Sequence, residues 1–92
     1  MMNFEWDASK AALNLQKHGV AFEDAQNVFY DLLRIERYDD RDDYCEDRWV
    51  TVGLVHYRLL SVAYTVRNET IRIISARKAD SDEQKQYRAA ND

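Results

Sequence analysis

Apolar and polar side chains alternate with a period of two through most of the second half of the chain. Residues 48–55 read RWVTVGLV and residues 58–67 read RLLSVAYTVR, so each stretch has one apolar face and one face of small or polar side chains. A third stretch, TIRIISARK at 70–78, is rich in β-branched residues, which favour a pleated, half-buried surface. The pattern predicts three consecutive strands, with tight turns near His56–Tyr57 and Asn68–Glu69.

Helical spacing replaces this alternation near the start of the chain. After a short strand predicted at Asn3–Trp6, Asp7 is placed to cap a helix from Ala8 to His18, and Gly19 is placed to close it. At about 100° per residue, one face of this helix holds only apolar residues. They are Ala8, Ala11, Ala12 and Leu15. We expect this face to pack on the core.

A second helix and a C-terminal one complete the predicted elements. Five apolar residues recur at helical spacing, namely Phe22, Ala25, Val28, Phe29 and Leu32. They predict a helix from Phe22 to Leu32, weakly capped because Ala21 offers no side-chain acceptor. A strand is expected near Arg34–Tyr38. Asp80 and Glu83 imitate a capping box, which predicts the start of the C-terminal helix.

These elements predict a single α+β domain over residues 1–92. Two N-terminal helices would pack on one side of a twisted antiparallel sheet, and the other side would hold a shallow, partly open groove. A chain of 92 residues with 46% hydrophobic content supports one core but not two. It has no apolar run near the roughly 20 residues that span a bilayer, and no leader-like start. We therefore expect a cytoplasmic protein without membrane contact.

Disulfide and metal chemistry find little support in the sequence. Cys45 is the single cysteine, so it cannot form an internal disulfide, and no set of Cys and His has the spacing of a zinc site. The acidic segment 39–47, DDRDDYCED, does not match the ligand spacing of a calcium loop and is predicted to be a solvated loop. We expect no metal and no cofactor.

Charge is polarised along the chain. The formal net charge is −4, yet Arg48–Ala79 holds six Lys or Arg against one Glu, whereas 36–47 holds seven acidic residues against two basic ones. Arg67, Arg72 and Arg77 mark the last two predicted strands, and the planar guanidinium matches phosphate. They form a candidate anion platform, although exposed strand arginines also discourage edge aggregation. If the last strand alternates regularly, Arg72 and Arg77 face opposite ways, and we favour Arg77.

A group of polar side chains shares one face of the first predicted helix. Lys10, Asn14 and Lys17 fall together there, with His18 at the edge. Histidine ordinarily gains and loses a proton near neutral pH, so His18 is the natural candidate for proton transfer. The alternatives are ordinary solvation for the two lysines and a capping or packing role for the histidine.

The order of several short segments resembles a known family. Near the start they are FEWD at 4–7, Lys10, Asn14, KHGV at 17–20, and Phe22 with Ala25. Further along they are Glu46 with Arg48, Gly53, Thr65 with Arg67, RIISAR at 72–77, and Glu83 with Tyr87. Together these segments resemble the BrnT-type toxins over nearly the whole chain. The chain departs from the family in two ways: Ala21 replaces a capping Ser or Thr, and Tyr44 and Cys45 occupy a loop that usually holds His and Gly.

The resemblance implies a RelE-like fold and an endoribonuclease. Such a protein is the toxin of a type II toxin-antitoxin pair, which inhibits translation and growth by cutting RNA. A BrnA-like antitoxin would hold it inactive and would also bind operator DNA, so this chain would reach DNA only through the antitoxin.

Cleavage of RNA without metal needs a base for the 2′-hydroxyl proton, cations for the charged transition state and an acid for the leaving oxygen. We assign proton transfer to His18 and stabilisation of the phosphate to Lys17, Arg67 and Arg77. Further RNA contacts are assigned to residues at matching motif positions and to an aromatic able to stack on a base. These are Lys10, Asn14, Arg48, Trp49 and Thr65.

Two other functions remain open on the sequence alone. The acidic balance fits a catalytically silent module whose basic hairpin receives an acidic segment of an antitoxin or transcriptional regulator. Direct DNA binding is the third possibility, but the most basic region is predicted sheet and no recognition-helix pattern supports it.

Overall fold

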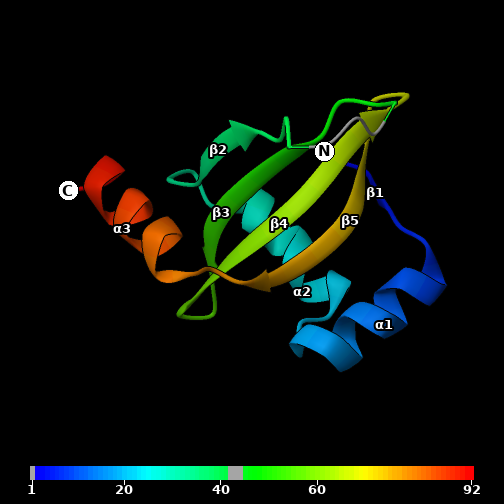
Figure 1. The fold of residues 1–92 in the computed structure, drawn as a ribbon, viewed down its shortest axis with the longest axis horizontal. Helices are drawn as coiled ribbons and strands as arrows, with labels where there is room; N and C mark the ends of the chain where they lie inside the picture. Colours follow the sequence, from blue (N-terminus) through cyan, green and yellow to red (C-terminus); the bar gives the residue numbers. More distant parts are fainter. Residues whose placement is uncertain (1, 42–44) are drawn as a thin grey trace.

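The computed structural model describes residues 2–41 and 45–92, and the sheet built from them is the frame of the molecule (Figure 1). Its strand order is β1–β5–β4–β3–β2. The strands are β1 Phe4–Glu5, β2 Ile35–Tyr38, β3 Trp49–Val55, β4 Arg58–Arg67 and β5 Thr70–Lys78. The helices are α1 Ala8–His18, α2 Phe22–Ala25, the 3-10 helix η1 Gln26–Tyr30 and α3 Ser81–Ala90. The predicted α+β class is confirmed. Three residues of the acidic segment, including Tyr44, lie outside the described residues.

The expectation of a wholly antiparallel sheet is wrong at one edge. Strands β2 to β5 pair antiparallel, but β1 runs parallel to β5, with Phe4 opposite Ile71 and Glu5 opposite Arg72. The β3–β4 and β4–β5 hairpins have two-residue turns, which impose antiparallel pairing. No turn joins β1 to β5, so its direction is not constrained in this way.

Both predicted hairpin turns are confirmed, and their backbone is left-handed. His56 and Tyr57 have φ of 48° and 68°, and Asn68 and Glu69 have φ of 51° and 63°. Two consecutive residues with positive φ form the turn type that matches the right-handed twist of the flanking strands. Non-glycine residues thus accept unfavourable backbone angles in order to connect the strands tightly.

The first helix has the predicted ends but not the predicted buried face. The Asp7 side chain accepts from the Lys10 amide at 3.0 Å, and Gly19 closes the helix with φ of 68°. Leu15, however, is 51% exposed, and the buried residue of α1 is Asn14. The reason is that α1 lies beside β5, where β1 pairs only with residues 71–72 and leaves the rest of the strand edge without a neighbour.

The second helix is shorter than predicted. It ends at Ala25 and continues as the 3-10 helix η1, and Leu32 is 96% exposed. The tighter 3-10 turn still buries Val28 and Phe29 against the sheet. The helical segment then ends at Asp31, because the Asp31 carboxylate accepts hydrogen bonds from the Leu33 and Leu54 amides.

One apolar core lies between the sheet and the α1, α2 and η1 segments. Its fully buried members include Val20, Phe22, Ala25, Val28, Leu60, Val62 and Ala76. Gly53 lets η1 approach β3 closely, since a Cβ there would lie 2.8 Å from Val28 Cγ1 and 3.2 Å from the Val28 carbonyl oxygen. No helix in the described part of the chain is long and apolar enough to cross a membrane.

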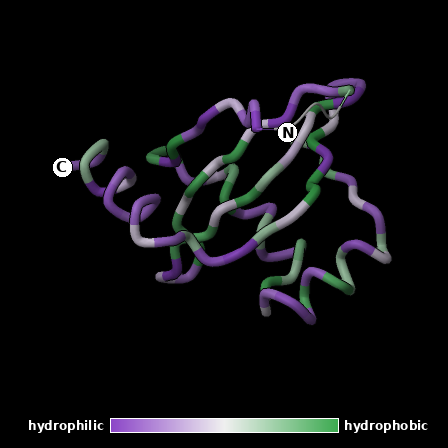
Figure 2. The backbone as a smooth tube through the Cα atoms, in the orientation of Figure 1, coloured by the Kyte–Doolittle hydropathy of each residue, from purple (hydrophilic) through white to green (hydrophobic). Residues whose placement is uncertain are grey.

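The opposite face of the sheet is partly covered by α3. This helix is mostly hydrophilic, as Figure 2 shows, and its buried residue is Glu83. The predicted capping box is present, because Asp80 accepts from the Glu83 amide and Glu83 accepts from the Asp80 amide. Tyr87 donates to Asp31 at 2.7 Å, and burial and this bond raise the pKa of Tyr87 to about 12. Polar contacts therefore anchor α3 to the sheet.

Candidate functional site

A bulge in β5 brings its two arginines, Arg72 and Arg77, onto one face of the sheet. Ala63 pairs with Ser75, but the next pair is Tyr64 with Ile73, so Ile74 is an extra residue. Arg72 pairs with Thr65 and Arg77 pairs with Ser61. Because Thr65 and Ser61 lie four residues apart on β4, they face the same way. The expectation that Arg72 and Arg77 lie on opposite faces is wrong, since it assumed a regular strand.

Five arginines gather on this surface, which we call the arginine face. It is the side of the sheet that carries α3, and its arginines are Arg37, Arg48, Arg67, Arg72 and Arg77. Between them the face holds small or short side chains, namely Ser61, Ala63, Thr65 and Ser75. Three glutamates pair with the five arginines. Among the described residues, the face thus holds five arginines against these three glutamates, although the chain as a whole is acidic.

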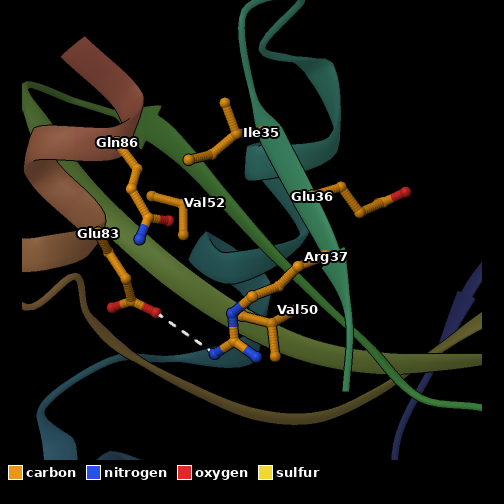
Figure 3. Close-up of a pocket in the computed structure, with 7 residues that line it drawn as sticks. All are labelled: Ile35, Glu36, Arg37, Val50, Val52, Glu83 and Gln86. Atoms are coloured by element: carbon orange, nitrogen blue, oxygen red, sulfur yellow. Dashed lines mark ion pairs between the residues drawn. The ribbon is translucent and has the colours of Figure 1, made fainter. Parts of the chain in front are cut away.

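Glu83 is the hub at one end of the arginine face. Arg77 donates two hydrogen bonds to it, at 2.7 and 3.2 Å, and the Ser61 hydroxyl donates at 2.9 Å. Arg37 approaches the same carboxylate from β2, at 3.9 Å (Figure 3). Burial by itself would raise the pKa of Glu83, but Arg77, the Asp80 amide and Ser61 together lower it. With both oxygens occupied, Glu83 is suited to orient Arg77 rather than to accept a proton.

The charge of Glu83 is expected to make stability depend on pH. Glu83→Gln should lower the free energy of unfolding by about 2 kcal/mol at neutral pH, because it removes a buried charged hydrogen-bond acceptor. The folded-state pKa lies below its ordinary value of 4.5, so this stabilisation is present above pH 4.5 and is lost as the pH falls through the lowered value. Urea unfolding of wild type and Glu83→Gln at successive pH values measures the difference between their free energies of unfolding. This difference should become smaller in acid.

A matched control for this measurement is Glu23→Gln, at an exposed glutamate of α2. It should leave the unfolding free energy nearly unchanged at every pH. If the unfolding free energies of wild type and Glu83→Gln differ by a constant amount from neutral to acid pH, this would contradict an ionised, paired Glu83.

Glu46 is the second hub, at the other end of the face. Its carboxylate lies 2.7 Å from the Arg67 guanidinium and 3.5 Å from Arg48 Nε. The hydrogen bond from Arg67 is the main reason why the pKa of Glu46 is lowered, against a smaller effect of burial. Thr65 is buried, and its hydroxyl donates to the Asp47 carbonyl. Thr65 therefore fixes the chain segment that leads into β3.

The side chains proposed on α1 line a hollow at the edge of β5. This open hollow of about 210 Å³ is lined by Lys10, Leu13, Asn14, Lys17, His18, Ile74 and Ser75. Ser75 is exposed and belongs to the arginine face, so the hollow continues that face around the sheet edge. Asn14 is 7% exposed and bonds backbone: its amide donates to the Val20 and Ala76 carbonyls, and its oxygen accepts from the Ala76 amide.

The structure thus separates the predicted site residues into three places. Lys10, Lys17 and His18 meet at the hollow. Arg77 lies on the neighbouring part of the sheet, whereas Arg67 is six residues further along β4 than Ser61, the partner of Arg77. At about 3.3 Å per residue this is roughly 20 Å, too far for both arginines to hold one phosphate.

Trp49 lies on the other face of the sheet. It stacks on Tyr64 with ring centroids 5.9 Å apart, and Tyr64 packs against Phe29 in the core. Tyr64 thus belongs to the core. Burial and a hydrogen bond to Glu36 raise the pKa of the Tyr64 hydroxyl.

Three members of the arginine face escaped sequence reasoning as site residues. Arg37 was part of a short predicted strand, and Ser75 lay within the RIISAR motif without a role of its own. Glu83 was assigned a capping role and a family motif position. Arg37 and Arg77 approach one carboxylate although 40 positions separate them in the chain. No local sequence pattern predicts this shared contact. The available signal was the alternation of side chains along β2, which sets the face of the sheet on which Arg37 lies.

The chain matches a known protein family over most of its length. The model of one family, described as "Ribonuclease toxin, BrnT, of type II toxin-antitoxin system", matches residues 6–83. This span includes both arginine hubs and the hollow beside α1. No curated protein matches the chain significantly.

Proposed function

The chain belongs to the BrnT family of ribonuclease toxins of type II toxin-antitoxin systems, and from this premise we propose that it cuts RNA on its arginine face without a metal ion. Cleavage would inhibit translation and growth. The family implies an antitoxin partner. We propose that this partner is BrnA-like, keeps the chain inactive, and provides its only link to operator DNA.

The excess of arginine over glutamate on the arginine face supports this proposal most directly. Glu83 is shared by two arginines, so one carboxylate faces two guanidinium groups at that hub. Lys10 and Lys17 add two charges where the face continues to the hollow. A polyanion can displace partly satisfied ion pairs of this kind, because every phosphate brings a full negative charge.

The roles we propose follow from position. Arg77, held by the buried Glu83, would stabilise the charge that develops on the phosphate. His18 and Lys17, from the hollow beside Ser75, would supply proton transfer and a second cation. Arg48 and Arg67, at the Glu46 hub, would bind a more distant phosphate.

The remaining predicted contacts take indirect roles in this proposal. Asn14 and Thr65 use their side chains to bond backbone groups, and would support RNA binding by fixing α1 and the start of β3. Trp49 lies on the other face, outside the proposed cleavage site.

Incubation of the purified chain with RNA of mixed sequence tests the proposal. We expect fragments to form in excess EDTA, whereas DNA of the same sequence should stay intact because it lacks the 2′-hydroxyl. His18→Ala should lose cleavage while remaining folded. RNA that stays intact with well-folded wild-type protein, or cleavage that EDTA stops and Mg²⁺ restores, would refute metal-free cleavage.

A silent binding module is the second candidate, and one observation favours it. Each arginine of the face is already paired with a glutamate, which shows that the face accepts carboxylates. An acidic segment of a partner protein could therefore take their place. Intact RNA combined with a tight complex between the chain and its antitoxin would select this candidate.

A further inference from the structure

The strand register aligns four residues of the arginine face in one row across the sheet. Arg37 pairs with Val50, Val50 with Ala63, and Ala63 with Ser75. The row therefore crosses β2, β3, β4 and β5 at right angles to the strands. Beyond Ser75 it meets the hollow beside α1, which Lys10, Lys17 and His18 line.

Taller groups stand on both sides of this row. On one side the next pair across is Ser61 with Arg77, above which Glu83 brings α3 down onto the sheet. On the other side, Thr65 pairs with Arg72, which lies 3.4 Å from Glu5. Within the row, Ala63 is half-buried and Ser75 is exposed. Val50 is 4% exposed, so the accessible middle of the row is formed by the short side chains of Ala63 and Ser75, between the longer Arg77 and Arg72.

Both ends of the row carry positive charge. Arg37 extends over Val50 toward Glu83 at one end, as Figure 3 shows, and its side chain is 44% exposed. Lys10 and Lys17 occupy the other end. Along the strands, by contrast, α3 covers one end of the face and the Glu46 cluster with Arg48 and Arg67 occupies the other. A linear polyanion therefore has its clearest path across the strands.

We propose that this row, from Arg37 through Val50 and Ala63 to Ser75, is the floor of a track for single-stranded RNA. The idea rests on the proposed ribonuclease function and specifies where its substrate runs. Three strand spacings of about 4.8 Å give a floor of roughly 14 Å. At the stacked spacing of about 3.4 Å per nucleotide, this length holds at most about four nucleotides. Arg77 lies beside the floor at its Ser75 end, because both residues are on β5.

Ser75→Phe is the variant that tests the track. It places a large ring on the floor at an exposed position and removes no charge, so the fold should persist. Val66→Phe is its matched control, since Val66 is 49% exposed on β4 but faces the other side of the sheet. Binding is measured with 2′-O-methyl RNA of mixed sequence, which cannot be cut, in lengths of two, four and eight nucleotides.

The track predicts three results. Ser75→Phe should weaken binding of the RNA at least about tenfold, as expected when a contact of 1.4 kcal/mol is lost, while Val66→Phe binds like wild type. Affinity should rise steeply from two to four nucleotides and little beyond. Lys17→Ala and Arg37→Ala, at the two ends, should each reduce the salt dependence of binding by close to one phosphate contact.

Failure of the track can be told apart from failure of the ribonuclease function. If Ser75→Phe binds and cuts RNA like wild type while Arg77→Ala does not cut, the track is refuted and the cleavage site stands. If Ser75→Phe keeps RNA cleavage but is no longer inhibited by the antitoxin, this row is a protein-binding site and the track is again refuted. If wild type neither binds nor cuts RNA, both proposals fall.

Discussion

Arg77→Ala is expected to lower the rate of RNA cleavage by about a hundredfold. The guanidinium of Arg77 is held by two hydrogen bonds to a carboxylate that is itself buried and bonded to Ser61. A cation fixed in this way meets the developing phosphate charge without reorganising, and loss of one such donor typically costs about 10²-fold or more in rate. The measurement is the single-turnover rate on excess enzyme, together with growth of cells that express each protein.

Two companion variants keep this result interpretable. Arg77→Ala leaves the Glu83 carboxylate buried beside fewer cations, so the double variant Arg77→Ala with Glu83→Gln removes that charge and protects the fold. Arg67→Ala, at the distant hub, should weaken RNA binding more than it slows the cleavage of bound RNA. Wild-type single-turnover rates in both Arg77 variants would show that this arginine takes no part in the chemistry.

Asn14→Asp is expected to cost about 3 kcal/mol of stability. The amide group of Asn14 donates to two carbonyls, of Val20 and Ala76, at 2.9 and 2.8 Å. The exchange replaces this donor by an oxygen that faces both carbonyls, which leaves buried acceptors unsatisfied and buries a charge. Urea unfolding measures the loss, and hydrogen exchange should locate it at the β5 edge beside Ala76. Because α1 carries Lys17 and His18, RNA cleavage should fall as well.

Asn27→Asp is the matched control, because Asn27 is exposed on η1. It introduces the same charge without touching the strand edge, and its unfolding free energy should stay within about 0.5 kcal/mol of wild type. An Asn14→Asp protein as stable as wild type but unable to bind RNA would show that Asn14 contacts RNA directly.

Local patterns predicted most of the elements because they record local physics. Alternation in RWVTVGLV and RLLSVAYTVR predicts strands, and both segments are strands. The apolar face of β4 is the core face, but in β3 the apolar Val50 and Val52 lie on the arginine face, opposite Ala63 and Ser61. Asp7, Gly19 and the pair Asp80 and Glu83 satisfy helix ends through bonds that span three or four residues. The cationic hairpin was also visible, since arginine placement in a strand can be read directly.

The prediction was wrong where a residue's role depends on a distant partner. Leu15 seemed to belong to the core face of α1, yet Asn14 is buried because its partner Ala76 is 62 positions away. Leu32 fitted the helical spacing, but the helical segment ends at Asp31, whose carboxylate accepts a hydrogen bond from the Leu54 amide of β3. Gly53 had a recognisable motif position, while its reason, the close approach of Val28, appears only in the packed structure.

The sequence by itself determined the α+β class, the hairpins, the helix caps and the family, since each of these rests on short-range spacing or on ordered motifs. Tertiary structure decided which charged groups work together. The bulge at Ile74 shifts the alternation of side chains along β5 by one residue, which places Arg72 on the same face as Arg77. Strand pairing then brings Arg37 to Glu83 and sets Ala63 beside Ser75. Register and bulges depend on pairing between strands, so a single strand's sequence does not specify them.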